Sequence, residues 1–157
     1  MSEAARILIV DDDENIRKVL KTILEDEGYT VESVDTAKKG IEKSEKAFFN
    51  LALIDVRLPD MEGIELLAKM RDTKPKMRKI IITGYPTLQN AVAAVNKGAD
   101  AFVMKPFDVE KLLQTIRDQL KKQKEDKSYS EERVAEFIET RIKELDTIDE
   151  HKVKSRA

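Results

Sequence analysis

The chain has 157 residues, enough for one folded domain with an extension, and it contains no cysteine, which excludes disulfides, thiolate metal sites and thiol nucleophiles. Its 29 basic and 31 acidic residues give a net charge of -2, so no overall positive field indicates binding to nucleic acid or to a membrane surface. The longest apolar runs are far too short to span a membrane, and the first residues lack the pattern of a signal peptide. We therefore expect a cytoplasmic protein.

Five short apolar runs alternate with amphipathic stretches up to about residue 122. The runs are predicted to be strands because they are short and apolar on both faces, as in a buried parallel sheet. They comprise residues 6–10, 30–34, 51–55, 79–83 and 101–105. Between them, apolar residues recur at spacings of three and four, which is typical of helices that cover a sheet. Strands that alternate with helices predict an α/β domain around a parallel sheet.

Capping residues mark the ends of several predicted helices. Asp13, Thr36 and Asp108 suit N-cap positions, because a short side-chain oxygen can accept hydrogen bonds from the free N–H groups of a first turn. Gly28 and Gly98 follow the first and fourth helices, where a residue in the left-handed conformation is expected.

Polar side chains follow four of the predicted strands at their carboxyl ends. Aspartates close the first and third strands, a threonine the fourth and a lysine the fifth; they are Asp11, Asp12, Asp13, Asp55, Thr83 and Lys105. Open parallel sheets bind ligands at this edge. If the first and third strands are neighbours, their carboxylates converge, and they stay ionised only beside a compensating cation. Oxygen ligands with positions left open to water suit Mg²⁺.

The same edge is equipped for phosphoryl chemistry. A metal ion, an ammonium group and a hydroxyl group can together neutralise the oxygens of a phosphoryl group, and an aspartate carboxylate can accept one. Taken singly, each residue has an ordinary structural interpretation, which we favour for Asp13 as a helix cap. Their joint occurrence at four strand ends predicts a magnesium and phosphoryl site.

Residues from about 4 to about 122 resemble the receiver domain of two-component response regulators. The segments that carry the resemblance are ILIVDDDENIR, LALIDVRLPDMEGIELL, IIITGY and GADAFVMKPFDVEKLL. The segments DVRLPDMEG and ITGYPTLQNAV are similar in sequence to those of receivers attached to enhancer-binding transcription activators. The resemblance implies a doubly wound, flavodoxin-like five-stranded parallel sheet of order 2-1-3-4-5, with helices on both faces. A C-terminal helical extension would follow.

The resemblance also implies a role for each acidic position. Asp55 would accept the phosphoryl group from the phosphohistidine of a histidine kinase and would contribute to the metal site. Asp12 would bind Mg²⁺ directly, and Asp11 would act mostly through water. The backbone carbonyl of Arg57 would complete the protein ligands.

The remaining site residues would sense the phosphoryl group. Thr83 and Lys105 would each bind one of its oxygens, and Thr83 would couple it to Phe102, an aromatic that swings inward. Arg57 and Tyr85 occupy the positions that line the path of attacking water in the family. The resemblance thus implies no enzyme in the usual sense, but an Mg²⁺-dependent phosphoacceptor with at most self-phosphorylation and self-dephosphorylation activity.

Three functions remain open from the sequence. In the first, the chain is a phosphorylation-controlled switch whose face around helix four, strand five and helix five binds an unknown downstream protein. In the second, it is the input half of a transcription regulator whose output domain is missing. A phosphotransfer relay is the third. No basic helix-turn-helix pattern follows the domain, so we expect no direct contact of the chain with nucleic acid, and none with a membrane.

The end of the chain is predicted to form a separate helix. Residues 1–122 would be the receiver domain, the polar residues 123–130 a linker, and residues 131–157 an amphipathic tail that Ser128 or Ser130 caps. An apolar stripe close to a heptad seam runs along this tail: Val134, Phe137, Ile138, Ile142, Leu145 and Ile148. A short helix is marginal alone, so the stripe must be buried by self-pairing, by folding back or by a partner. We favour a homodimer through helix five and the tail.

Overall fold

The computed structural model describes residues 4–84 and 86–156, and it places the side chains of these residues except 127–132 and 146–156. The prediction for Tyr85 and that for the side chain of Ile148 lie outside this description. Two compact units can be distinguished along the chain, Met1–Gln123 and Lys124–Ala157.

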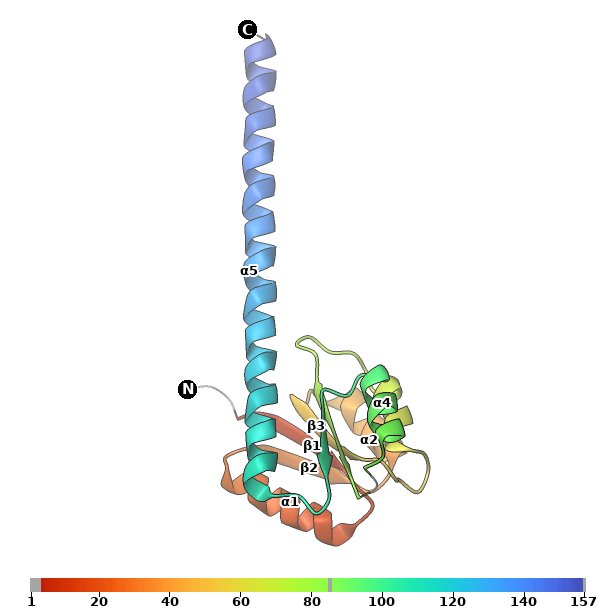
Figure 1. Cartoon of the computed structure of the whole chain (residues 1–157). Coiled ribbons are helices and arrows are strands. Elements are labelled where there is room, and N and C mark those ends of the chain that lie inside the picture. The colour runs from red at the N-terminus through yellow and green to blue at the C-terminus, as the bar shows by residue number, and fades with distance from the viewer. Residues whose placement is uncertain (1–3, 85, 157) are drawn as a thin grey trace. The chain divides into compact units, whose positions relative to one another are not determined.

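The first unit is built on a five-stranded parallel sheet of order β2-β1-β3-β4-β5, as predicted (Figure 1). Its strands are β1 (Arg6–Val10), β2 (Thr30–Val34), β3 (Leu51–Asp55), β4 (Arg78–Thr83) and β5 (Ala101–Met104). Three strands have the predicted bounds, whereas β4 begins one residue earlier and β5 ends one residue earlier.

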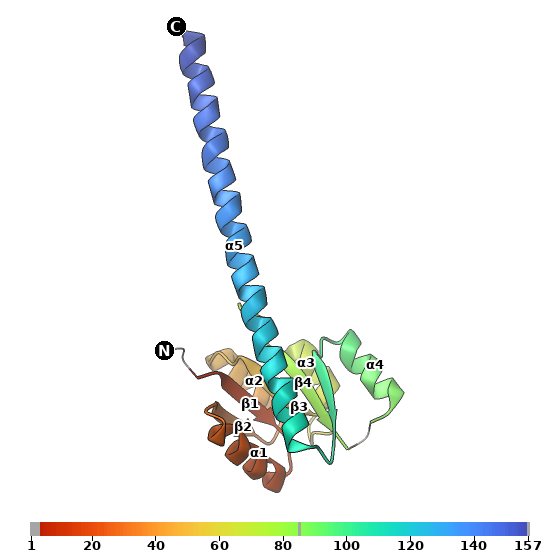
Figure 2. The same ribbon diagram turned by 60° about the vertical axis from the view of Figure 1, so that its left-hand side comes forward.

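Helices cover both faces of the sheet. They are α1 (Glu14–Asp26), α2 (Ala37–Lys46), α3 (Gly63–Lys69), α4 (Leu88–Asn96) and α5 (Val109–Arg156). Figure 2 shows α1 and the beginning of α5 on one face, and α2, α3 and α4 on the other.

Two apolar cores correspond to these two faces, because successive side chains of a strand point to opposite sides. Under α2, α3 and α4, the core includes Leu8, Val10, Ala52, Ile54, Ile81, Ala37, Leu66, Leu67 and Ala94. Under α1 and α5, it includes Ile7, Ile9, Leu51, Leu53, Ile80, Ile82, Leu20, Leu24, Leu112, Leu113 and Ile116. Burial on both faces explains why these strands have nearly continuous apolar sequences.

The predicted caps hold the helix ends in place. The carboxylate of Asp13 accepts hydrogen bonds from the first turn of α1, and Thr36 Oγ1 accepts one from that of α2. Asp108 Oδ1 accepts a hydrogen bond from the N–H of Lys111 at 3.2 Å. Gly28 and Gly98 have φ angles of 93° and 102°, in the left-handed region where a glycine costs least.

Helix α5 continues without interruption through residues 123–130, where the sequence predicts a linker. This run contains no glycine or proline and is rich in lysine, glutamine and glutamate, which favour helices even without an apolar face. The backbone therefore has no second helix start at which Ser128 or Ser130 could act as an N-cap. Although α5 has 48 residues, no described helix is apolar over a stretch long enough to cross a membrane.

Candidate functional site

The carboxyl ends of β1, β3, β4 and β5 form one edge of the sheet, near the start of α5 (Figure 2). Strand β3 lies between β1 and β4, and their register sets the height of the polar residues: Val10 pairs with Ile54, and Asp55 pairs with Ile82. The aspartates after β1 therefore come beside Asp55, as the sequence predicts.

Three carboxylates meet at this edge. Asp11, Asp12 and Asp55 each present an oxygen, and these oxygens lie within 4.8 Å of one another. Asp11 is 3% exposed, Asp55 is half-buried and Asp12 is exposed. Burial raises the pKa of Asp55, and the negative charge of Asp11 raises it further. The crowding of like charges makes this edge a place where a cation is favourable.

Lys105 supplies one positive charge to the cluster. Its Nζ lies 2.9 Å from Asp11 Oδ2 and 3.5 Å from Asp55 Oδ1. Burial acts to lower the pKa of Lys105, but the hydrogen bond and charge of Asp11, together with Asp55, outweigh it and raise the pKa. One ammonium beside three carboxylates leaves two negative charges, which a divalent cation would balance.

Both carboxylate oxygens of Asp11 already accept hydrogen bonds within the protein. Oδ1 accepts from the N–H of Asp13 at 2.9 Å, and Oδ2 accepts from Lys105. Arg17 Nη1 donates to the Asp11 carbonyl at 2.7 Å, which holds the backbone after β1. Asp12, by contrast, is exposed at the mouth of the cluster, so it is the more available of the two for a direct bond to a metal ion.

The carboxylate of Asp13 is not part of the cluster. Its Oδ1 accepts hydrogen bonds from the N–H groups of Asn15 at 2.9 Å and Ile16 at 3.2 Å. This confirms that the third consecutive aspartate is the N-cap of α1.

The loop between β3 and α3 packs directly on the backbone of Asp55. Arg57 and Glu62 form an antiparallel bridge, and the N–H of Gly63 donates to the Val56 carbonyl at 2.7 Å. A Cβ atom on Gly63 would overlap the carbonyl oxygen of Asp55, so only glycine lets α3 start this close to the strand. In the sequence, Gly63 indicated only a cap or a turn, so its close contact with the backbone of Asp55 was not predicted.

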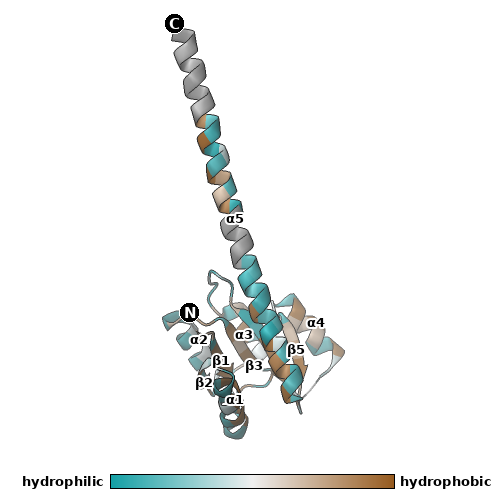
Figure 3. Ribbon diagram, turned by 90° about the vertical axis from the view of Figure 1, so that its left-hand side faces the viewer, coloured by the Kyte–Doolittle hydropathy of each residue, from teal (hydrophilic) through white to brown (hydrophobic). Residues whose placement is uncertain are grey.

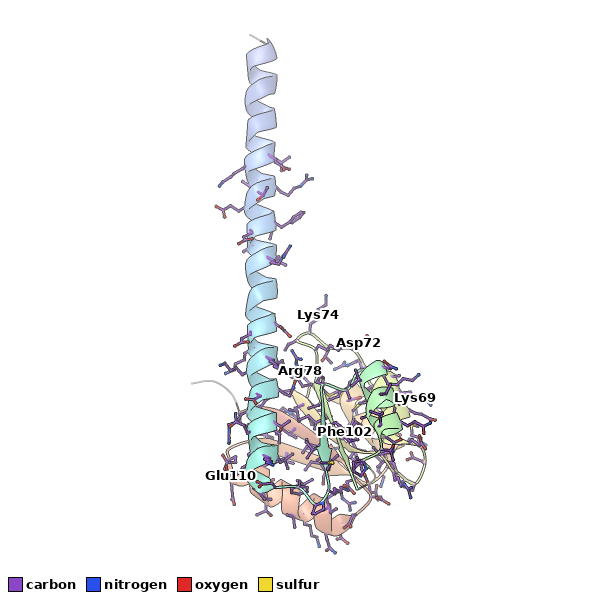
Figure 4. The ribbon with its side chains drawn as sticks, viewed as in Figure 1. Lys69, Asp72, Lys74, Arg78, Phe102 and Glu110 are labelled. Atoms are coloured by element: carbon purple, nitrogen blue, oxygen red, sulfur yellow. The ribbon has the colours of Figure 1, made fainter. Side chains whose placement is uncertain are left out.

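Thr83 lies on β4, the strand next to that of Asp55, and Phe102 lies on β5, one strand further along the sheet. Thr83 is fully buried at the end of β4, and its carbonyl accepts a hydrogen bond from the N–H of Lys105 at 2.7 Å. Phe102 is half-buried on β5, where Figure 4 labels it, and it packs against the core under α2, α3 and α4. The peptide bond between Lys105 and Pro106 is cis.

One acidic residue near the site has a role that the sequence did not reveal. The carboxylate of Asp60, in the loop after β3, accepts hydrogen bonds from the N–H groups of Ala37 and Lys38, each at 2.9 Å. The pKa of Asp60 is lowered by these hydrogen bonds, most by the one from Lys38 and next by the one from Ala37. The helix start that they satisfy belongs to α2, 23 and 22 residues away in sequence, so no local pattern could identify the pair.

Comparison with known proteins points to one family. The family model of the response regulator receiver domain matches residues 7–117. Uncharacterized transcriptional regulatory protein YkoG of Bacillus subtilis is 36% identical over 119 residues, which are 76% of this chain and 52% of that protein. Transcriptional regulatory protein GlrR of Escherichia coli is 34% identical over 137 residues, which are 87% of this chain and 30% of that protein. The chain thus spans about half or less of the length of these relatives.

Solved structures agree with the fold. A response regulator receiver domain protein (CheY-like) from Methanospirillum hungatei JF-1 is 51% identical, with a TM-score of 0.75, over 78% of this chain and 98% of that one. The beryllofluoride-activated NtrC4 receiver domain dimer is 36% identical, with a TM-score of 0.71, over 75% of this chain and 98% of that one.

Proposed function

Because the chain belongs to the response regulator receiver family, we propose that it is a phosphorylation-controlled signalling switch in which Asp55 accepts a phosphoryl group from a histidine kinase. The phosphorus–nitrogen bond of phosphohistidine breaks as a carboxylate oxygen of Asp55 bonds to phosphorus, which gives an acyl phosphate. The observation that carries this proposal is the position of Asp55 between two other carboxylates and the Lys105 ammonium, at the ligand-binding edge of the sheet.

The donor set fits Mg²⁺. It consists of oxygens alone, its net charge is that of two uncompensated carboxylates, and the exposure of Asp12 leaves room for water. Asp12, Asp55 and the backbone carbonyl of Arg57 would hold the ion, and Asp11, whose oxygens are already engaged, would act through water. When bound, the ion would neutralise charge on the phosphoryl oxygens.

The protein's own groups would bind the other phosphoryl oxygens. Lys105 would exchange part of its contact with Asp55 for a phosphoryl oxygen, and the Thr83 hydroxyl would bind another. Any turnover would be confined to self-phosphorylation and self-dephosphorylation.

The output would be read at α4 and β5. Movement of Thr83 toward the phosphoryl group would change the space open to Phe102, which lies on β5 and packs against the core under α4. Four large apolar side chains of α4 and β5 are exposed: Leu88, Val92, Val95 and Met104, of which Leu88 is 81% exposed. Figure 3 shows the apolar colour on α4. Such a surface suits a downstream protein that binds the phosphorylated form.

A dimer is the partner that we propose for the tail. Within the part of the tail whose side chains are described, Val134, Phe137, Ile138, Ile142 and Leu145 are 52% to 66% exposed. Apolar bands follow one another along this part of α5 in Figure 3. Self-pairing would bury them as in a short coiled coil. The NtrC4 receiver, similar to residues of the first unit, is described as a dimer.

A second function, the input half of a transcription regulator, is favoured by one observation: YkoG and GlrR are named as transcriptional regulators and are longer than this chain. The complete reading frame would distinguish it from a stand-alone switch. Transfer of phosphate back to a histidine phosphotransfer protein would instead indicate a relay.

The acceptor assignment is tested by intact mass after incubation with acetyl phosphate and Mg²⁺. We expect the wild type to gain the mass of one phosphate and Asp55→Asn to gain none. Asp13→Asn is the matched control, since it alters a neighbouring carboxylate while asparagine still caps α1, and it should be phosphorylated like the wild type. A phosphate on Asp55→Asn would contradict the assignment.

A further inference from the structure

Asp60 connects the loop after β3 to the start of α2, a connection that the proposed reaction does not itself require. Its loop follows the acceptor strand β3 and contains Arg57, whose backbone carbonyl we assign to the metal site. Its two carboxylate oxygens accept one hydrogen bond each from Ala37 and Lys38, at the start of α2. The loop between acceptor and α3 is thereby attached to a helix that bears no residue of the site.

The loop is restrained at its base and at its tip by different interactions. At the base, Arg57 bridges Glu62, and Gly63 donates to the Val56 carbonyl. Leu58 and Met61 pack partly against the core. Near the tip, the Asp60 carboxylate bonds to the start of α2. A loop held at both places keeps a backbone ligand in position before the ion arrives, so less conformational entropy is lost on binding.

We propose that Asp60 is a positioning residue for the metal and acceptor site. Its hydrogen bonds to α2 hold the segment that carries the Arg57 carbonyl in position. Through the same bonds, binding of the metal ion changes the environment of the first residues of α2. The inference rests on the proposed function, because it requires the ion at Asp12, Asp55 and Arg57. Since coupling between sites is reciprocal, whatever displaces α2 would also change the affinity for Mg²⁺.

The start of α2 offers a matched control. Three of its first N–H groups are satisfied by two different side chains: Asp60 accepts from Ala37 and Lys38, and Thr36 Oγ1 accepts from Lys39 at 3.1 Å. Thr36→Ala removes a cap from the same turn while leaving the loop attached. Asp60→Ala removes the cap and the attachment together. Asp60→Asn keeps one acceptor oxygen and should behave as a partial rescue.

The experiment measures Mg²⁺ binding to the full chain by amide chemical shifts, since the protein has no tryptophan. We expect Asp60→Ala to raise the dissociation constant about tenfold, the usual effect of losing a group that orients a ligand. The dissociation constant of Asp60→Asn should lie between those of the wild type and Asp60→Ala, and that of Thr36→Ala should equal the wild-type value. At saturating Mg²⁺, phosphorylation of Asp60→Ala by acetyl phosphate should return toward the wild-type rate. The amides of Ala37 and Lys38 should respond to Mg²⁺ in the wild type but not in Asp60→Ala.

Two results would overturn the inference. If Asp60→Ala binds Mg²⁺ like the wild type, or if Thr36→Ala weakens binding equally, Asp60 is only a cap of α2. Should Asp60→Ala fail to fold, an Asp60→Asn variant with wild-type affinity and wild-type responses at Ala37 and Lys38 would have the same meaning. A wild type that neither binds Mg²⁺ nor accepts phosphate would instead overturn the proposed function itself, and the inference with it.

Discussion

The two edges of the sheet differ in their polar side chains: neutral amides lie at the amino edge, and a cluster of carboxylates lies at the carboxyl edge. At the amino edge, Asn50 Oδ1 accepts from the N–H of Arg6 at 2.8 Å, and Gln123 Nε2 donates to the carbonyls of Asn50 and Lys76 at 2.9 and 2.8 Å. At the carboxyl edge, three carboxylates lie together, and one ammonium group, that of Lys105, pairs with two of them. Figure 4 labels Arg78, the first residue of β4, and Glu110, in the first turn of α5, which mark the two edges.

The difference separates stability from ligand binding within one sheet. The neutral amides of Asn50 and Gln123 form hydrogen bonds with each other and with the backbone at the start of β1 and just before β3 and β4, so these polar groups are satisfied within the protein. The cluster at the carboxyl edge has more negative than positive charge, so binding of a cation would be favourable there. Gln123 is 4% exposed, so the first unit extends one residue beyond the boundary that the polar sequence suggested.

The largest effect is expected from a substitution that disrupts the packing of α3 against the carboxyl edge of the sheet. In Gly63→Ala, the new methyl group would collide with the backbone of Asp55, and we expect a loss of about 3 kcal/mol of unfolding free energy. Gly84→Ala is the control, because nothing lies within 4 Å of a Cβ there. Urea unfolding compares the two variants. Equal stability of both would show that α3 can retreat from Asp55 at little cost.

A smaller effect is expected when the amino edge is broken. Gln123→Ala removes the donor to the carbonyls of Asn50 and Lys76 and the acceptor for the Asn50 side-chain amide, and the loss of these three hydrogen bonds should cost about 2 kcal/mol. Phosphorylation by acetyl phosphate should stay unchanged, since the site lies at the other edge. Lys122→Ala, at an exposed position on the same helix, should alter neither stability nor phosphorylation. A loss of phosphorylation in Gln123→Ala would refute the separation of roles.

Added Mg²⁺ should act at one edge only. At a free concentration ten times the dissociation constant, binding to the folded state stabilises it by about 1.4 kcal/mol. We expect this increase for the wild type and for Gln123→Ala. In Asp12→Ala it should largely disappear, because an exposed member of the carboxylate cluster is lost. Thermal unfolding with and without Mg²⁺ measures it; an undiminished increase in Asp12→Ala would place the ion elsewhere.

The smallest expected effect is a difference in pKa between two aspartates near the carboxyl edge, Asp60 and Asp55. Hydrogen bonds from Lys38 and Ala37 lower the pKa of Asp60, whereas burial and Asp11 raise that of Asp55. The folded state holds the Asp60 proton less tightly than the unfolded chain, so its contribution to stability is present above pH of about 4 and is lost as the pH falls through the lowered pKa. Carboxyl-carbon NMR titration without Mg²⁺ should place the two midpoints on opposite sides of the ordinary value. Midpoints that coincide would contradict the assigned contacts.

The strands could be predicted because their causes are local, and the acidic cluster could be predicted once the resemblance to receiver domains supplied the order of the strands. Five apolar runs and the order of polar residues after them are visible in sequence, and Asp13 caps a helix that begins at the next residue. Asp60 and Gln123 could not be predicted, since their partners lie 22 to 73 residues away and depend on the packed fold. Both look like ordinary surface residues in the sequence. The helical course of residues 123–130 was hidden for a similar reason, because a polar run without apolar spacing is compatible with helix and linker alike.

The measurement that tests the switch most directly compares amide chemical shifts before and after phosphorylation in the wild type and in Thr83→Ala. Both proteins should accept phosphate at Asp55, because Thr83 is not the acceptor. In the wild type, changes should extend from the site to Phe102 and α4; in Thr83→Ala, those distant changes should be largely lost, since the contact that distinguishes the two states is missing. Equal changes around Phe102 in the two proteins, or none in the wild type, would contradict a switch that operates through Thr83.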